Sequence, residues 1–403
     1  MVHKRFALAA LFLVILIDSI GASLILPLLE PLLLSENSVF LSEGSPFYKS
    51  SLYGFSLMSF AAAMFIGAPM LGDLSDRVGR KPMLLYCLWG TLLGYLISGA
   101  AIIIKNPTFF ILGRIIDGFT AGSLPVAQAG IIDVSDKDKT VQNLGYILFA
   151  VSIAYVGGPL IGGVLSQGVF PTYFPLFLAA AIAFINILIL QSFYHDASIA
   201  RESEVRLDFK LGFTHFFAAF KHAEIRNFSI ILLLLQLAWT YYFQFIGFYA
   251  SKTFTVDSVS IAWLLLFIGL GMALSFCFLA GKLNAKVKPR WLLSGGLLGI
   301  ALLFILSMQC TQFITLCLLG FLSSVIYAVM YTSLLGLLSK HAGHKAQGLI
   351  MGIAGSISAF SAGSTALIGG FIMSLQLVTP FYMIGAILLL AGFLSNIQSI
   401  SDN

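Results

Sequence analysis

The polar stretch GDLSDRVGRKP, from Gly72 to Pro82, separates two apolar segments at 51–73 and 83–104. Each segment is about as long as a helix needs to be to cross the ~30 Å hydrocarbon core of a bilayer. Within the stretch, Gly79 permits backbone angles that other residues resist, and three basic residues surround it. The stretch therefore predicts a tight, positively charged turn between two membrane-spanning helices.

The composition of the whole chain agrees with this interpretation. Of its 403 residues, 59% are hydrophobic and only 10% are charged, whereas a soluble domain carries about 25% charged residues. The mean hydropathy is +0.98. These values exclude a soluble enzyme, a disordered chain and a disulfide scaffold. They also exclude a nucleic-acid-binding protein, because the net charge of +5 has no soluble domain on which to form a basic face.

Twelve apolar segments follow one another along the chain, and none alternates apolar and polar residues as the strands of a membrane barrel do. This pattern predicts an all-α, polytopic membrane protein with twelve transmembrane helices in two pseudo-symmetric six-helix bundles. The segments are 5–33, 51–73, 83–104, 108–133, 140–168, 172–194, 226–251, 258–281, 291–308, 311–339, 346–374 and 378–398.

A polar stretch near the middle of the chain divides the predicted helices into two sets of six. We expect an N-terminal bundle over 1–194, a cytoplasmic linker over 195–225 and a C-terminal bundle over 226–403. Phenylalanines recur in the linker at helical spacing beside lysines, which is typical of an amphipathic helix lying along a membrane surface. They are Phe209, Phe213, Phe216, Phe217 and Phe220.

Basic residues are distributed unevenly between the two sets of loops. Eighteen of the 22 Lys and Arg residues fall on the side of the chain termini, and only Lys49, Lys105 and Lys252 fall on the other side. Cytoplasmic loops of membrane proteins are enriched in Lys and Arg. We therefore expect a multi-pass protein of the cell (inner) membrane with both termini in the cytoplasm.

The turn after the eighth segment repeats the pattern of the turn after the second. It reads GKLNAK from Gly281 to Lys286, against GDLSDR from Gly72 to Arg77. Internal repeats are the usual basis of transporter folds, in which a central site opens alternately to the two sides of the membrane. The repeat predicts a transporter of a small-molecule substrate.

Three charged residues lie deep inside predicted spans, Asp18 in the first and Arg114 and Asp117 in the fourth, while Glu30 is expected near the outer mouth of the first. A charge at the bilayer centre costs about 2.5–3.5 kcal/mol on insertion scales, so such residues are functional by default. Arg114 and Asp117 are one helical turn apart and can pair. We expect these three residues to couple proton movement to transport. Two alternatives stay open: a static buried pair in the fourth span, and an Asp18 that faces a permanently wet vestibule.

The turn after the second segment is also a candidate conformational latch. Asp76 can accept hydrogen bonds from a neighbouring helix N-terminus. Arg77 can pair with Asp133 at the inner end of the fourth span, and this contact would break when the conformation changes. The predicted latch residues are Gly72, Asp76, Arg77, Gly79, Arg80 and Asp133.

Aromatic and amide side chains gather in spans four, seven and ten. Such side chains suit a mostly apolar, adaptable pocket, and aromatic rings can hold a cationic substrate. Each of them singly is also compatible with lipid or packing contacts. The candidate substrate-binding residues are Gln128, Gln236, Trp239, Tyr241, Tyr242, Gln244, Tyr327 and Tyr331.

The stretch from Gly72 to Pro82 resembles the loop signature of the major facilitator superfamily between spans two and three. Three further segments resemble its twelve-span drug/proton antiporters, especially the tetracycline/proton antiporter group. They are DSIGASLILP from Asp18 to Pro27, RIIDG from Arg114 to Gly118, and GPLIGG from Gly158 to Gly163 with Gly145 before it. Two residues depart from the pattern of that group. Asp117 replaces another polar residue, and Ala154 stands where a glycine is usual.

The segment from Gly158 to Gly163 has a physical reading beside the resemblance. Glycines four or five residues apart let helices approach closely, and Pro159 removes a backbone hydrogen bond and bends the helix. Such a segment can seal the interface between the two halves on one side of the membrane, although ordinary small-residue packing also explains each glycine. The predicted gate residues are Gly145, Gly158, Pro159, Gly162 and Gly163.

Taken together, the resemblance and the buried charges imply a proton-coupled exporter of a small amphipathic molecule, such as a drug or a secreted metabolite like a siderophore. The alternative is a proton symporter that imports a metabolite or siderophore. The chain has no P-loop, no histidine inside a predicted span and no cysteine cluster, so we expect no cofactor and no metal. We expect no enzymatic activity, and a chain that works as a monomer.

Overall fold

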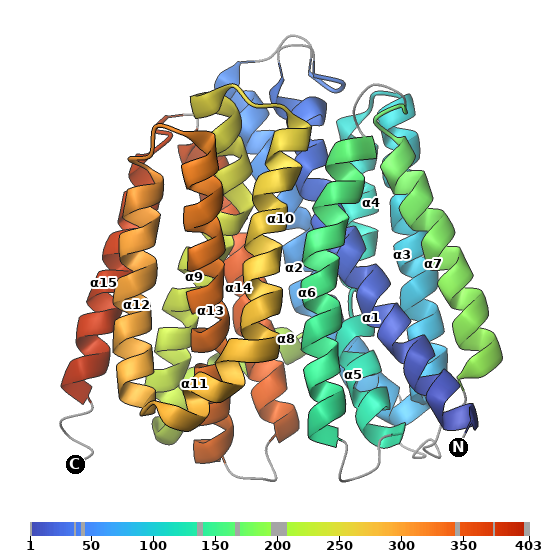
Figure 1. Ribbon diagram of the computed structural model, residues 1–403. Helices are drawn as coiled ribbons and strands as arrows, with labels where there is room; N and C mark the ends of the chain where they lie inside the picture. Colours follow the sequence, from blue (N-terminus) through green and yellow to red (C-terminus); the bar gives the residue numbers. More distant parts are fainter. Residues whose placement is uncertain are drawn as a thin grey trace. The chain divides into compact units, whose positions relative to one another are not determined.

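The computed structural model describes residues 2–35, 38–41, 45–134, 140–165, 170–194, 208–342, 347–373 and 375–398. Within these ranges the chain is helical and forms no β-strand (Figure 1). The elements follow from sequences that are rich in apolar helix formers and that end at glycine, proline or capping residues. Asn106, for example, caps the fourth helix by accepting from the backbone amides of Thr108 and Phe109, and Pro107 occupies the first helical position.

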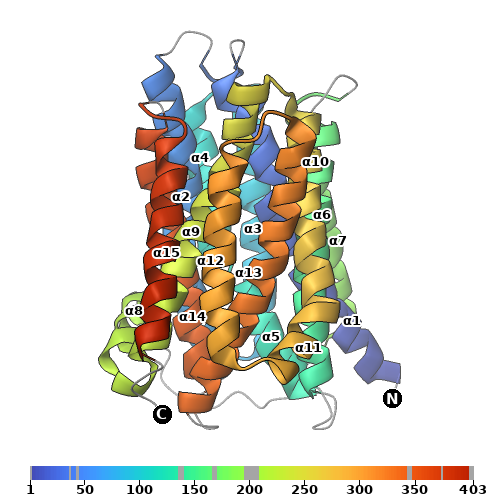
Figure 2. The ribbon, with the colours of Figure 1, turned by 60° about the vertical axis from the view of Figure 1, so that its left-hand side comes forward.

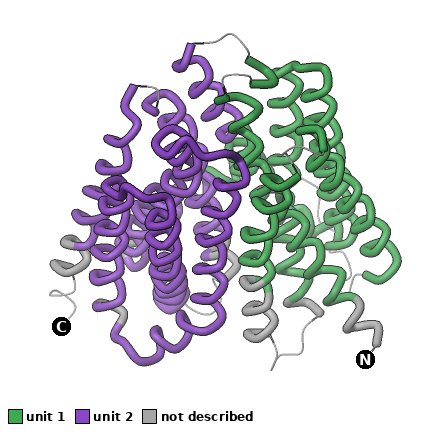
Figure 3. The backbone as a smooth tube through the Cα atoms, turned by 45° about the horizontal axis from the view of Figure 1, so that its top comes forward, with its two compact units in different colours: residues 1–44, 59–213 green, residues 45–58, 214–403 purple. Residues whose placement is uncertain are grey.

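The helices form two compact units, coloured separately in Figure 3. Unit 1 comprises Met1–Gly44 and Ser59–Phe213, and unit 2 comprises Ser45–Met58 and Thr214–Asn403. Unit 1 contains α1 (Val2–Leu29), most of α2 (Pro46–Val78), α3 (Arg80–Ile103), α4 (Pro107–Thr120), α5 (Ser123–Val134), α6 (Thr140–Leu165) and α7 (Phe174–Phe193). Unit 2 contains most of α8 (Leu211–Lys221), then α9 (Ala223–Phe254), α10 (Ser258–Leu274), α11 (Ala280–Lys286), α12 (Pro289–Ser307), α13 (Phe313–Ala342), α14 (Gln347–Ile372) and α15 (Thr379–Gln398).

Nine described helical segments are long and apolar enough to cross a membrane, and three shorter apolar helices accompany them. The short ones are Ala150–Leu165, Trp291–Ser307 and Thr379–Gly392. Each of the twelve falls on one of the twelve predicted spans. The all-helical, twelve-span architecture is therefore confirmed.

The two units divide the chain differently from the expected bundles at the start of α2. Residues Ser45–Met58 group with unit 2. The Tyr53 hydroxyl donates to the Gln244 carbonyl at 2.7 Å. A Cβ added at Gly54 would lie 2.4 Å from the Ala366 carbonyl oxygen and 2.6 Å from the Gly370 Cα. This close approach of α2 to α14 depends on glycines from two distant segments, so the apolar pattern of one span does not reveal it.

The fourth predicted span is not one continuous helix. Helix α4 ends at Thr120, and α5 begins at Ser123 after a two-residue turn. Pro125 explains the break, because proline cannot donate to the carbonyl four residues earlier, and its ring clashes with that carbonyl. The break follows Asp117 by about one turn of helix. It therefore ends α4, the helix that carries the buried Arg114 and Asp117.

Helix α10 continues through a π-helical turn, Ser275–Leu279, into α11. Ser275 is buried, and its hydroxyl donates to the Val325 carbonyl of α13 at 2.8 Å. A second π-helical turn, Glu30–Leu34, follows α1. The two turns show where spans one and eight depart from regular α-helix.

Candidate functional site

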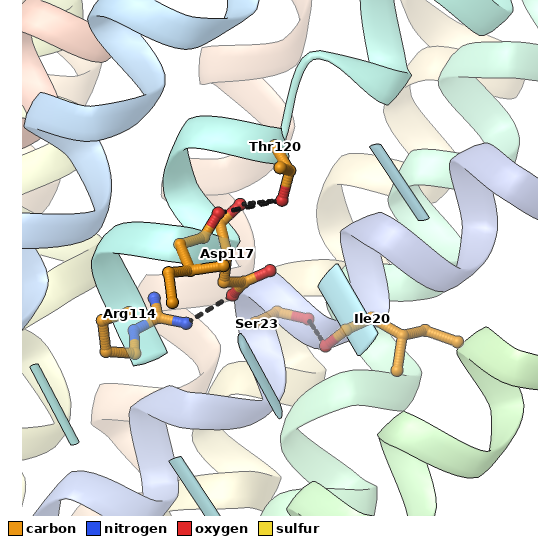
Figure 4. A network of polar contacts seen from close by, with 6 residues as sticks. Ile20, Ser23, Arg114, Asp117 and Thr120 are labelled. Atoms are coloured by element: carbon orange, nitrogen blue, oxygen red, sulfur yellow. Dashed lines mark hydrogen bonds and ion pairs between the residues drawn. The ribbon is translucent and has the colours of Figure 1, made fainter. Parts of the chain in front are cut away.

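The centre of the candidate site is an ion pair inside α4. The Arg114 Nη1 atom lies 2.9 Å from the Asp117 Oδ2 atom, and the two residues are only 3% and 4% exposed. The Arg114 guanidinium also lies 4.3 Å from the centre of the Phe60 ring of α2, within the range of a cation–π contact. Figure 4 shows Arg114 and Asp117 pointing toward each other. The predicted pairing is therefore present, and both of its side chains are buried.

Asp18 of α1 belongs to the same electrostatic environment. Both of its carboxylate oxygens are buried, and neither has a hydrogen-bond partner within the described part of the chain. The charge of Asp117 acts on Asp18. Burial without a partner penalises the ionised form of a carboxyl group. The two acids therefore differ, since Asp117 has a cationic partner and Asp18 has no hydrogen-bond partner among the described residues.

Tyr95 of α3 joins these charges, and the sequence analysis did not identify it. It is 2% exposed, and Asp117, Asp18 and Arg114 all act on it electrostatically. Its hydroxyl fills the space beside Gly21, where an added Cβ would lie 1.3 Å from the hydroxyl oxygen. The glycine in the first span therefore makes room for a tyrosine from the third.

A signal for Tyr95 was present in the sequence. Tyr95 is one of several polar or small side chains that lie on one side of α3 at spacings of three or four residues. Each of these side chains is buried. They are Cys87, Thr91, Tyr95 and Ser98.

Helix α3 fixes the position of the ion pair by close packing on α4. A Cβ added at Gly94 would lie 2.8 Å from the Asp117 Cβ and 2.9 Å from the Gly113 carbonyl oxygen. A Cβ added at Gly113 would lie 2.3 Å from the Ser98 Oγ. Because neither helix can carry a side chain at these two glycines, Asp117 is held against the backbone of α3.

The glycines of span five pack on α1. The Ser23 hydroxyl donates to the Ala154 carbonyl of α6 at 3.0 Å. A Cβ added at Gly158 would lie 2.0 Å from the Ser23 Oγ, and one at Gly162 would lie 2.3 Å from the Leu24 carbonyl oxygen. The pair therefore brings α6 into close contact with the helix that carries Asp18.

The other predicted gate residues also lie in α6. Pro159 and Gly163 are buried. The surroundings of Gly145 lie outside the described residues. The contacts of α6 with α1 are made within unit 1, and a seal between the two halves stays a prediction.

The predicted latch contains two ion pairs along α2 and into α3. Arg77 Nη2 lies 2.9 Å from Asp73 Oδ2. Arg80 pairs with Asp76, and its Nη1 atom donates to the Ser75 hydroxyl at 2.6 Å. Asp76 thus accepts from the arginine that opens α3.

The other three latch residues are Asp133, Gly79 and Gly72, and they have different surroundings. The side chain of Asp133 lies outside the described residues, so its pairing with Arg77 stays a prediction. Gly79 adopts φ 110° and ψ 152° at the start of α3, which fits the backbone freedom inferred from the sequence. Gly72 lies in open space, with nothing within 4 Å of an added Cβ.

We expect Gly79→Ala to lower stability by about 1–2 kcal/mol, because a side chain disfavours this positive φ. The measurement is the shift in thermal unfolding of the detergent-purified protein. Gly72→Ala is the control, since it adds the same methyl group within helix α2, where the added Cβ makes no contact. Equal shifts for the two variants would contradict a conformational role for Gly79.

Four of the candidate substrate-binding residues lie together in unit 2. The Tyr327 hydroxyl donates to the Gln236 Oε1 atom at 2.7 Å. The Trp239 ring stacks on the Tyr327 ring at 4.1 Å, and Tyr327 stacks on Tyr331 at 5.8 Å. The Gln236 amide donates to the Ser358 hydroxyl of α14. This aromatic–amide cluster of Gln236, Trp239, Tyr327 and Tyr331 joins α9, α13 and α14.

Gln244 lies two turns further along α9 and also contacts α14. Its amide donates to the Ala362 carbonyl at 3.1 Å, and its Oε1 atom accepts from the Thr365 hydroxyl at 3.3 Å. Gln128 is half-buried on α5 of unit 1. These two residues are therefore not part of the aromatic–amide cluster as the described contacts define it.

Tyr241 and Tyr242 point into the packing of unit 2. Tyr242 is fully buried, stacks on Phe304 of α12 at 4.1 Å and shares a hydrogen bond with Ser307 at 3.2 Å. Tyr241 is 4% exposed and stacks on Phe245 at 4.9 Å. Their surroundings are those of core residues.

No group of three or more His, Cys, Asp or Glu side chains that could hold a metal occurs among the described residues.

Comparisons with known proteins place this geometry in a family context. The family model described as Major Facilitator Superfamily matches residues 11–306 and 228–396. The chain is 30% identical over 282 residues to the class H tetracycline resistance protein of Pasteurella multocida, an alignment covering 68% of the chain and 66% of the relative.

Two solved structures share the fold over nearly the whole length. The human organic anion transporter MFSD10 has a TM-score of 0.74 at 22% identity and covers 97% of this chain and 99% of its own. A D-xylose-proton symporter has a TM-score of 0.78 at 14% identity and covers 97% of both chains.

Proposed function

Because the chain belongs to the major facilitator superfamily, whose members are membrane transporters rather than enzymes, we propose that it is a proton-coupled secondary transporter that exports a small amphipathic molecule. The substrate would be a drug or a secreted metabolite such as a siderophore. Export would proceed by alternating access, with the site exposed first to one side of the membrane and then to the other.

The observation that carries the proton coupling is the contrast between the two buried acids. Asp18 has two buried carboxylate oxygens without a hydrogen-bond partner in the described residues, and Asp117 is paired with Arg114 at 2.9 Å. A proton on Asp18 relieves the cost of a buried, unpaired charge. When Asp18 ionises, its negative charge repels that of Asp117 in the same buried environment. Proton release at Asp18 would thereby weaken the pair on α4.

The direction of transport rests on the relatives. A tetracycline resistance protein aligned over two thirds of this chain supports export of a drug-like molecule. The fold alone does not set direction, since a sugar–proton symporter shares it. Import by symport is therefore the alternative that an experiment has to separate from export.

The aromatic–amide cluster of unit 2 is the proposed substrate contact. Stacked rings offer a flat apolar surface and a binding face for a cation, while Gln236 supplies hydrogen-bond donors and acceptors. In the cell we place the protein in the inner membrane as a monomer with both termini in the cytoplasm, supported by the 18 basic residues on that side.

Proteoliposomes test the proposal. The purified protein is reconstituted with a pH-sensitive dye inside, a pH gradient is imposed, and lipophilic cations, tetracyclines and iron-chelating carboxylates are added in turn. We expect substrate-dependent proton movement opposite to substrate flux. We expect Asp18→Asn and Asp117→Asn each to reduce proton-linked transport at least tenfold. Glu224→Gln, an exposed acid at the start of α9, serves as the control.

The outcomes separate the hypotheses. Proton movement in the same direction as substrate would replace export by symport. Intact proton-linked transport in both Asp→Asn variants would remove the coupling role from the buried acids.

Tyr327→Phe tests the substrate contact. The change keeps the ring that stacks on Trp239 and removes the hydroxyl that donates to Gln236. One such hydrogen bond contributes about 0.5–1.5 kcal/mol, so we expect the KM for transport to rise about two- to tenfold. Tyr382→Phe, on the exposed side of α15, is the control. An unchanged KM in Tyr327→Phe would exclude this hydroxyl from substrate recognition.

A further inference from the structure

Helix α8 carries an exposed line of aromatic side chains. Phe209, just before the helix, and Phe213 and Phe217 within it are 54%, 50% and 56% exposed. Their spacing of four residues places them on one side of the helix. We call these three residues the phenylalanine stripe.

The opposite side of α8 packs on α14 within unit 2. The Phe216 ring lies 4.5 Å from the ring of Phe360. The His215 ring lies against the backbone of Gly352, where an added Cβ would be 2.8 Å from its Nδ1 atom. Figure 2 shows α8 alongside the lower part of α14.

The level of Phe360 in the membrane gives the depth of α8. The apolar span of α14 runs over Gly352–Ile372. Phe360 lies eight residues into it, which is about 12 Å along a helix at 1.5 Å per residue. The contacts of α8 on α14 therefore extend from the first residue of this apolar span, at Gly352, to about 12 Å inside it, at Phe360.

A contact within unit 1 also lies far from the charged end of a spanning helix. Phe213 packs edge-on against Phe65 of α2 at 4.9 Å, and an added Cβ at Gly212 would lie 2.2 Å from the Phe65 carbonyl oxygen. Arg77 lies near the charged end of α2. Phe65 lies twelve residues before Arg77, which is about 18 Å along the helix. The start of α8 is thus also at hydrocarbon depth.

We propose that α8 is inserted into one leaflet of the bilayer and that the phenylalanine stripe is a binding surface for phospholipid acyl chains. The leaflet is the inner one in the proposed orientation. The exposed lysines that flank the helix, Lys210 and Lys221, extend their aliphatic stems so that the ammonium groups reach the headgroups. This differs from the helix lying along the membrane surface that the sequence predicts.

Spin labelling measures the depth directly. Single cysteines replace Phe213, Phe217, Phe184 or Lys221 in the full chain, after Cys87, Cys277, Cys310 and Cys317 are changed to serine. Each protein is labelled with a nitroxide and reconstituted in phosphatidylcholine vesicles. Collisions with oxygen report hydrocarbon, and collisions with a water-soluble nickel chelate report water. Phe184, 44% exposed on the membrane-spanning α7, is the lipid-facing reference.

We expect the labels at Phe213 and Phe217 to match the label at Phe184, with oxygen collisions dominant, and the label at Lys221 to collide mainly with the nickel chelate. Nickel collisions at Phe213 and Phe217 equal to those at Lys221 would overturn the insertion. They would instead place the helix on the surface or in water.

A second measurement keeps all four native cysteines. Phe217→Trp and Lys221→Trp are each made in the otherwise unchanged chain and reconstituted in vesicles of lipids brominated on their acyl chains. Bromine quenches only the tryptophans that it contacts. The four native tryptophans give a background of quenching. We expect Phe217→Trp to be quenched more than this background and Lys221→Trp not to be. Equal quenching in both variants, or none in either, would refute the acyl-chain contact.

Discussion

Replacing Arg114 by leucine will destabilise the protein more than any other single change considered. The substitution leaves the Asp117 carboxylate in a site that is 4% exposed, without the guanidinium that lies 2.9 Å from it. Breaking a buried pair by removing one partner costs about 3–5 kcal/mol, because the remaining charge stays buried. We expect a large fall in the thermal unfolding temperature in detergent, and loss of transport.

The double variant Arg114→Leu/Asp117→Leu separates stability from function. Removing both charges restores most of the lost stability, since a well-packed apolar pair can replace a buried ion pair at little cost. Transport stays absent if the pair is part of the coupling. Asp73→Asn breaks the partly exposed pair with Arg77 and should cost no more than about 1 kcal/mol. A double variant with full transport would reduce the pair to a packing element.

The second large effect concerns the contact of α6 with α1. Gly158→Ala places a methyl group 2.7 Å from the Ile20 carbonyl oxygen, and Gly162→Ala places one 2.3 Å from the Leu24 carbonyl oxygen. Backbone atoms cannot rotate away, so the helices must separate. Overpacking of this kind costs about 1–3 kcal/mol. We expect each variant to unfold at a lower temperature and to transport more slowly, and the double variant to lose transport.

The neighbouring glycine provides the control for both. An added Cβ at Gly157 meets nothing within 4 Å, so Gly157→Ala should not lower the unfolding temperature. It should also gain slightly from the higher helix propensity of alanine. If Gly157→Ala slowed transport as strongly as Gly158→Ala, the cause would be helix flexibility and not the close contact with α1.

These two contacts meet near Asp18, the proposed proton carrier. Asp18 lies on α1, three residues before Gly21 and five before Ser23. Gly21 accepts the Tyr95 hydroxyl from α3, and Ser23 donates to the Ala154 carbonyl of α6. A change in the protonation of Asp18 therefore acts on a helix that is held on both sides by small residues. This arrangement links the charge of one carboxyl group to the packing of three helices.

The sequence was sufficient for features that depend on neighbouring residues. The length of the apolar segments predicts the twelve spans, because a helix must satisfy its own backbone hydrogen bonds inside a bilayer. The spacing of Arg114 and Asp117 predicts their ion pair, since residues three apart on a helix face each other. The glycine at position 79 predicts backbone angles that other residues resist, and the structure has a positive φ there.

The sequence could not show which side of each span faces protein. Spans that are apolar all round carry little periodicity, so the aromatic residues proposed to bind substrate and those that only pack look alike. Tyr327 donates to Gln236, whereas Tyr242 is enclosed between Phe304 and Ser307. The sequence treats the two tyrosines equally, and only their contacts distinguish them.

Tertiary structure decided the features that join distant segments. Tyr95 reaches the charges only because Gly21 of α1 leaves room for its hydroxyl, and Asp117 is held in place only because Gly94 and Gly113 let α3 and α4 touch. The sequence by itself determined that the chain crosses the membrane, where it turns and which charges it buries, because these depend on local hydrophobicity and backbone geometry. The partners of those charges depend on how the helices pack, and packing is a property of the folded chain.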